Sequence, residues 1–203
     1  SEVQAARRLL DQAWLEVSDE LRARGSAIRY PSLGAMIEVP ATIYLLPDLA
    51  PYVDFWSVGT NDLTQYLLAV DRNNARVADM YDGLHPAVLR ALQQIIQVAN
   101  QQAKPVSVCG ELAGDSIGVL ILLAMGYRRF SMNLNNIAKV KYLLRRVRTD
   151  ALAPLLEQAI QLSDSAQIRK IFTNYLESLG LQSFISKDRK STRLNSSHAN
   201  VSR

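Results

Sequence analysis

Residues 54–72 read Asp-Phe-Trp-Ser-Val-Gly-Thr-Asn-Asp-Leu-Thr-Gln-Tyr-Leu-Leu-Ala-Val-Asp-Arg. In this stretch an apolar run ends at the polar pair Asn61 and Asp62, and a helical pattern follows from Leu63 to Val70. Short apolar runs of about four to eight residues are typical of buried strands, whereas apolar residues spaced three and four apart are typical of helices. The stretch therefore predicts a strand and a helix that are joined at Asn61 and Asp62.

The same order of strand, polar residue and helix occurs four times along the chain. The predicted strands cover residues 33–39, 53–60, 105–109 and 130–133. The predicted helices cover residues 1–24, 41–49, 63–70, 86–102, 116–125, 137–146, 151–162 and 166–179. Each strand is nearly continuous in its apolar content, as strands that are covered on both faces tend to be. Alternating strands and helices indicate an α/β fold with a parallel sheet.

Four strand and helix units are half of a (β/α)8 barrel, which typically needs about 250 residues. An open piece with four strands would leave its sheet edges and one side of its core uncovered. We therefore predict that residues 1–150 form the C-terminal half of a TIM barrel and that the chain begins in the middle of a larger protein. Residues 151–185 are expected to form a terminal helical pair. Residues 71–85, an extra segment rich in Asp, Asn and Arg, are expected to be a loop over the site.

Composition and charge limit the possible classes of function. The chain has 203 residues, of which 48% are hydrophobic and 21% are charged, as in globular proteins. The net charge of +4 lies in residues 187–203, so the neutral remainder predicts no nucleic-acid partner. Residues 186–203 lack apolar periodicity, which predicts a disordered, non-native tail. The longest apolar run, residues 117–126, is too short to cross a membrane, and the single Cys favours a reducing, cytoplasmic location.

Four polar residues stand where predicted strands end: Glu38, Asn61, Asp62 and Cys109. In a barrel these points face one rim, where active sites lie. The carboxylates of Glu38 and Asp62 are suitable ligands for Mg²⁺, although acids at such positions are also often helix N-caps. Cys109 is either a buried, inert thiol or an acid or nucleophile at the rim. His85 is expected to have a structural role at the start of a helix.

The stretch 54–72 resembles the second signature of the phosphoenolpyruvate-utilising enzymes. Residues 34–40 (Gly-Ala-Met-Ile-Glu-Val-Pro) and 109–115 (Cys-Gly-Glu-Leu-Ala-Gly-Asp) match two further segments of that family in the right order. The second of these favours enzyme I of the sugar phosphotransferase systems over pyruvate phosphate dikinase. Residues 72–74, 80–82, 85–86 and 141–146 are most similar to the nitrogen-related form of enzyme I. The resemblance covers roughly residues 1–181, and Trp56 departs from the family pattern only as a packing change.

The resemblance implies a role for each candidate residue. Glu38 and Asp62 would bind Mg²⁺. Asn61, Asp62 and Arg72 would contact phosphoenolpyruvate, and Cys109 would protonate the enolate to give pyruvate. In the family, the phosphorylated histidine lies in a separate upstream domain, which passes the phosphoryl group to a histidine phosphocarrier protein. The family also dimerises through this region, so the resemblance implies a homodimer, and the chain alone is expected to be inactive.

Two other interpretations stay open at this point. A magnesium-dependent barrel lyase that acts on 2-oxo acids could share a Glu and Asp pair, although the long signature of residues 54–72 argues against it. A truncated barrel could also be kept as a non-catalytic dimerisation module. The intact set of Glu38, Asp62, Arg72 and Cys109 argues against degeneration of the site, but not against truncation.

Overall fold

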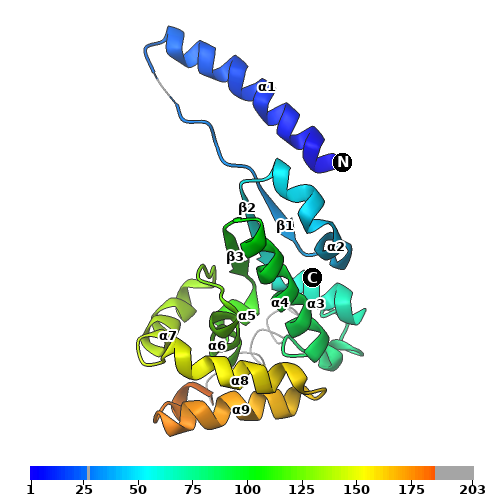
Figure 1. Cartoon of the computed structure of the whole chain (residues 1–203), viewed down its shortest axis with the longest axis vertical. Helices are drawn as coiled ribbons and strands as arrows, with labels where there is room; N and C mark the ends of the chain where they lie inside the picture. Colours follow the sequence, from blue (N-terminus) through cyan, green and yellow to red (C-terminus); the bar gives the residue numbers. More distant parts are fainter. Residues whose placement is uncertain (27, 186–203) are drawn as a thin grey trace, which may run out of the picture.

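The chain folds around a small parallel sheet and is mostly helical (Figure 1). The computed structural model describes residues 1–26 and 28–185. The strands are β1 (Gly34–Ile37), β2 (Phe55–Gly59) and β3 (Val106–Cys109). The helices are α1 (Glu2–Ala23), α2 (Pro40–Leu49), α3 (Thr60–Leu68), α4 (Pro86–Gln101), α5 (Glu111–Gly114), α6 (Ser116–Met125), α7 (Leu134–Leu144), α8 (Thr149–Gln161) and α9 (Ser165–Ser178), with short 3₁₀ turns η1 (Ala50–Tyr52) and η2 (Ala78–Met80). The predicted α/β class is confirmed.

The strands pair in parallel in the order β1-β2-β3. Ile37, Val58 and Val108 lie in one row across the sheet, and each is fully buried. The adjacent row contains Met36, which is 50% exposed, and the half-buried Ser57. The strands therefore alternate between a buried face and a partly open face. The expectation of cover on both faces is wrong for the described residues, because the face that carries Met36 and Ser57 is only partly covered by them.

The fourth predicted strand is present only as a single bridge between Phe130 and Val108. The backbone N–H of Val108 donates to Arg129 O (2.9 Å), and that of Ser131 donates to Val108 O (2.8 Å). Asn133 then caps α7 with its side chain, so the chain turns into a helix before a longer ladder can form. The prediction is correct about the position beside β3 and wrong about the length of the strand.

The predicted helices are all present among the described residues, and one shift in their ends affects the site. Helix α3 begins at Thr60 rather than at Leu63 and therefore contains Asn61 and Asp62 in its first turn. Trp56 is 1% exposed and packs in the core, as expected if its departure from the family pattern affects only packing.

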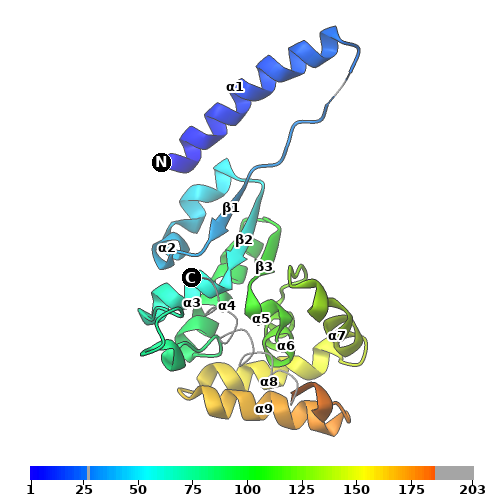
Figure 2. The same ribbon diagram turned by 180° about the vertical axis from the view of Figure 1, so that it is seen from behind.

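Helix α6 is the centre of the helical half of the protein. It packs against α5, α7, α8 and α9, and these helices lie together in both views (Figures 1 and 2). A helix that is apolar on all sides is stable only when it is surrounded, and residues 116–122 are buried. Within the described part of the chain, no helix is long and apolar enough to span a bilayer. The core runs without a break into α8 and α9, and a domain boundary at residue 150 stays a prediction.

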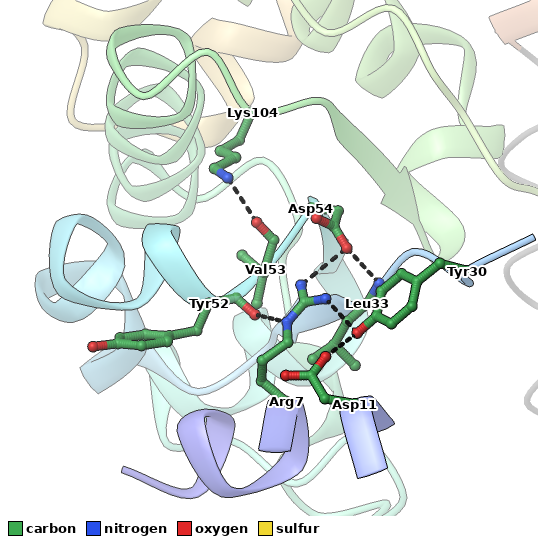
Figure 3. A network of polar contacts seen from close by, with 8 residues as sticks. All are labelled: Arg7, Asp11, Tyr30, Leu33, Tyr52, Val53, Asp54 and Lys104. Carbon is green, nitrogen blue, oxygen red and sulfur yellow. Dashed lines mark hydrogen bonds and ion pairs between the residues drawn. The ribbon is translucent and has the colours of Figure 1, made fainter. Parts of the chain in front are cut away.

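Helix α1 lies to one side of the sheet and is held there by a polar network (Figure 3). Arg7 donates from Nε to Tyr52 O (3.1 Å), from Nη1 to the Tyr30 hydroxyl (3.2 Å) and from Nη2 to Asp54 Oδ2 (2.9 Å). The backbone N–H of Leu33 donates to the same carboxylate oxygen (2.7 Å). The Leu33 hydrogen bond, followed by the Arg7 hydrogen bond, lowers the pKa of Asp54 from its ordinary value of 3.8. The network thus joins α1 to the segments before β1 and β2.

We predict that Asp54→Asn makes the stability of the chain less sensitive to acid. Because the pKa of Asp54 is lowered by folding, its carboxylate stabilises the fold fully above pH 3.8 and loses this effect as the pH falls through the folded-state value. The side chain is 45% exposed, so the effect is about 1 kcal/mol or less. Thermal melts at neutral pH and below pH 3.8 measure it. Asp19→Asn is the control, since Asp19 is 74% exposed in its pair with Arg22, and equal acid sensitivity in both variants would contradict the prediction.

Candidate functional site

The carboxylate of Glu38 lies against the end of β2. Glu38 directly follows Ile37, the last residue of β1, and is half-buried. A Cβ atom on Gly59 would lie 3.1 Å from Oε2 and 3.2 Å from Cβ of Glu38. Glycine at this position therefore allows a close approach that a larger residue would hinder. The pairing of the two strands thus brings Glu38, which follows β1, to the end of β2.

Asn61 and Asp62 lie in the first turn of α3, directly after β2. Gly59 is the N-cap of α3, and Val39 is the N-cap of α2; in neither helix does a side chain accept a capping hydrogen bond. The alternative that Glu38 and Asp62 are helix N-caps is therefore wrong. Both carboxylates remain available for an ion pair or a ligand.

Arg72 forms an ion pair with Asp62. Its Nη2 lies 3.2 Å from Asp62 Oδ1, and the backbone N–H of Arg72 donates to Gln65 Oε1 (3.3 Å). The Nη1 atom is buried and makes no well-formed hydrogen bond to a described residue. A buried donor without a partner is unfavourable, and a guanidinium group binds phosphate and carboxylate in a planar, bidentate way. Arg72 therefore has the chemistry to bind an anion at the start of α3, and its contact with phosphoenolpyruvate stays a prediction.

Cys109 is the last residue of β3 and pairs with Gly59 across the sheet. Its thiol donates a hydrogen bond to Val58 O (3.3 Å) and lies 3.9 Å from Ser57 Oγ. The residue is half-buried rather than enclosed in the core. The thiol thus lies at the same edge of the sheet as Glu38, and its role as a proton donor stays a prediction.

The turn after β3 is tied to the start of α3 by two hydrogen bonds. Thr60 Oγ1 donates to Cys109 O (2.8 Å), and the backbone N–H of Glu111 donates to Asn61 Oδ1 (2.9 Å). Between them Gly110 has a φ of +105°, and a Cβ there would lie 2.4 Å from Thr60 Oγ1. Only glycine fits this turn. The sequence analysis missed Thr60, although a hydroxyl residue next to Asn61 at the end of a strand was the available signal.

Tyr81 brings the loop of residues 71–85 to the same place. Its hydroxyl donates to Asn61 O (3.3 Å). Burial is the largest cause that raises the pKa of Tyr81, while nearby Thr64 and Arg72 act in the opposite direction. The phenol is therefore a neutral hydrogen-bond donor at neutral pH. The sequence analysis expected a loop here but missed Tyr81, and an aromatic residue in a segment rich in Asp and Asn was the only signal.

The donor set at this edge fits Mg²⁺. This ion usually takes one or two protein carboxylates and completes its coordination with water and phosphate. Glu38 lies against Gly59, and Asp62 pairs with Arg72, so both carboxylates come to one edge of the sheet. No group of three His, Cys, Asp or Glu side chains gathers as a metal site in residues 1–26 and 28–185. His85 does not belong to this set, because it caps α4 through Nδ1, which confirms the predicted structural role.

Comparisons with known proteins find one family for most of the chain. Residues 1–149 match the family described as PEP-utilising enzyme, PEP-binding domain. A Salmonella typhimurium protein named "Phosphoenolpyruvate-dependent phosphotransferase system" is 46% identical over 184 residues, and its Escherichia coli counterpart of the same name is 45% identical over 184 residues. Both alignments cover 91% of the chain and 24% of the relative. A Cupriavidus necator "Phosphoenolpyruvate-protein phosphotransferase" is 46% identical over 132 residues, which are 65% of the chain and 22% of that relative.

The chain thus spans about a quarter of the length of the curated relatives that it matches. The matched family region ends at residue 149, where α8 begins, and the alignments with the Salmonella typhimurium and Escherichia coli proteins are longer, at 184 residues each. All the candidate residues described above fall inside the matched family region.

Proposed function

Because the chain belongs to the family of PEP-utilising enzymes, as their PEP-binding domain, we propose that it is the phosphoenolpyruvate- and Mg²⁺-binding part of a phosphotransferase. In that enzyme the phosphoryl group passes to a histidine outside this chain and then to a phosphocarrier protein. The observation that carries the proposal is the ion pair between Asp62 and Arg72. The Nη1 atom of Arg72 is buried and lacks a well-formed partner among the described residues. Phosphoenolpyruvate offers a phosphate and a carboxylate to such a cation.

The proposal extends to the fold. The partly open face of the sheet, with Met36 and Ser57, would be the interior of a barrel whose remaining strands lie in another part of the enzyme. Ser57, Ser107 and Cys109 on this face lie near the ends of parallel strands, as residues at the catalytic rim of a barrel do. The sheet described above would then be part of the C-terminal half of a (β/α)8 barrel.

Arg72 and Asn61 would bind the substrate anion. Arg72 is oriented by Asp62 through Nη2 and by Gln65 through its backbone, and its buried Nη1 donor, which has no well-formed partner among the described residues, would meet an anionic oxygen. The Oδ1 atom of Asn61 is engaged by the Glu111 N–H, which leaves Nδ2 as the donor for a phosphate oxygen. Donors that are held in place before the substrate binds need little reorganisation during the reaction.

Glu38 and Asp62 would hold the Mg²⁺ ion. The bound ion would offset negative charge on the phosphate and on the enolate oxygen of the substrate. Asp62 would then orient both the metal and Arg72, which explains why a carboxylate in the first turn of α3 is not used as a cap.

Cys109 would complete the reaction as a general acid. Cleavage of the bond between phosphorus and the enol oxygen transfers the phosphoryl group to histidine and leaves the enolate of pyruvate. The thiol gives its proton to the methylene carbon of the enolate, a C–H bond forms, and the thiolate then takes a proton from water. The hydrogen bond to Val58 O holds the proton until the substrate is bound.

We predict that the 203-residue chain alone does not transfer phosphate, because nothing in it resembles the family's phosphorylated histidine domain. The chain joined to the part of the Salmonella typhimurium relative that the alignment leaves uncovered, here called the completed enzyme, should form pyruvate and phosphorylate a carrier protein. Labelled phosphoenolpyruvate measures both reactions. Sustained labelling of a carrier by the chain alone, or a folded but inactive completed enzyme, would contradict the proposal.

A further inference from the structure

Tyr81 connects the loop of residues 71–85 to the start of α3. Near the start of the loop, Arg72 is tied to α3 through Asp62 and Gln65. Further along, Tyr81 donates its hydroxyl proton to Asn61 O (3.3 Å). Arg72 and Tyr81 thus attach the two ends of one loop segment to a single helical turn.

The remaining side-chain hydrogen bonds of this segment are local. Asp71 accepts from the backbone of Asn73, and Asn74 accepts from the backbone of Arg76. Bonds between residues this close in sequence shape the loop but do not fix it to the sheet. Leu84 packs in the hydrophobic core near the far end of the loop, and the polar contacts that tie the loop to α3 are those of Arg72 and Tyr81.

The hydroxyl of Tyr81 also acts on Asn61 itself. The backbone oxygen of Asn61 accepts from Tyr81, and its side-chain oxygen accepts from the N–H of Glu111 in the turn after Cys109. A carbonyl oxygen can only accept, so the phenol must be the donor. Asn61 thus links Tyr81 to the turn that follows Cys109.

We propose that Tyr81 is a positioning residue that fixes Arg72 and Asn61 for binding of the substrate anion without touching the substrate itself. This inference rests on the proposed function. If Arg72 and Asn61 are misplaced, they bind the substrate and the transition state more weakly by the same amount. Such an equal loss of binding raises KM and leaves kcat nearly unchanged. A single hydrogen bond of ordinary strength predicts an increase in KM of about fivefold.

The test compares two Tyr→Phe variants of the completed enzyme. Tyr81→Phe should raise KM for phosphoenolpyruvate about fivefold, with kcat within about twofold of the parent. Tyr127→Phe is the matched control, because it also removes a hydroxyl that donates to a backbone carbonyl, that of Leu92 (2.8 Å), inside the helical core. It should lower the melting temperature and leave KM unchanged.

Hydrogen exchange of the 203-residue chain provides a readout that does not depend on activity. Residues 71–85 should exchange faster in Tyr81→Phe than in the parent, and at the parental rate in Tyr127→Phe. Unchanged exchange, or faster exchange with an unchanged KM, would overturn the positioning role. An inactive parental completed enzyme would instead reject the proposed function, and the inference with it. An active parent with unaltered KM in Tyr81→Phe would reject the inference alone.

Discussion

Cys109→Ala in the completed enzyme is expected to slow pyruvate formation by about 10² to 10⁴-fold, the usual contribution of a general acid. Binding of phosphoenolpyruvate should change little, because a thiol that acts only in the proton-transfer step lowers the barrier and not the energy of the bound substrate. The lost hydrogen bond to Val58 O (3.3 Å) contributes little to the fold, because a thiol is a weak donor. Initial rates and a binding titration measure the two effects separately.

Ser107→Ala is the matched control for this substitution. Ser107 lies on the same face of β3 and also donates to a backbone oxygen of β2, that of Trp56 (3.4 Å). Its removal should leave both rate and binding near the parental values. Cys109→Ser should keep the shape of the site without restoring the rate, because a hydroxyl is a much weaker acid than a thiol. Turnover near that of the parent in Cys109→Ala, in both directions of the reaction, would show that the thiol has only a structural role.

Glu38→Gln and Asp62→Asn are expected to lower activity by 10²-fold or more, since charge stabilisation by a metal ion is worth on the order of several kcal/mol. Each substitution removes one negative ligand and keeps nearly the same shape. Asp62→Asn also weakens the ion pair with Arg72, but both side chains are about one third exposed, at 38% and 32%, so the loss of stability should be about 1 kcal/mol or less. Activity should therefore fall far more than stability.

Asp164→Asn provides the control for these amide variants. Asp164 is a true N-cap, whose side chain accepts a hydrogen bond from the Ala166 N–H (2.9 Å) at the start of α9. Because Asn caps a helix about as well as Asp, this variant should keep both stability and activity. A loss of activity in Asp164→Asn equal to that in Asp62→Asn would mean that the effect does not arise from metal binding.

The order of strands and helices was predictable because each unit carries its own local signal. The run before Asn61 and the helical pattern after Leu63 depend only on neighbouring residues, and the structure confirms both as β2 and α3. The convergence of Glu38, Asp62 and Cys109 on one edge follows from the parallel pairing of the strands. The start of α3 at Thr60 was not predictable, since Gly59 caps the helix without a side chain and so leaves no capping residue in the sequence.

Contacts between distant segments were also beyond sequence analysis. The bond from Thr60 to Cys109 O and the bond from Tyr81 to Asn61 O join separate elements and exist only after the sheet and the loop are in place. The fourth strand was overestimated for a related reason. Apolar content near Phe130 indicated a strand, but the length of a strand depends on the partners available beside it.

Glu38 and Asp62 are proposed to bind the metal on which the reaction with phosphoenolpyruvate depends. A Mg²⁺ titration of pyruvate formation by the completed enzyme and its two amide variants, with thermal melts in parallel, tests this assignment. We expect both variants to melt near the parental temperature and to need far more Mg²⁺ for their residual activity. Unchanged dependence on Mg²⁺ in both Glu38→Gln and Asp62→Asn would contradict the assignment.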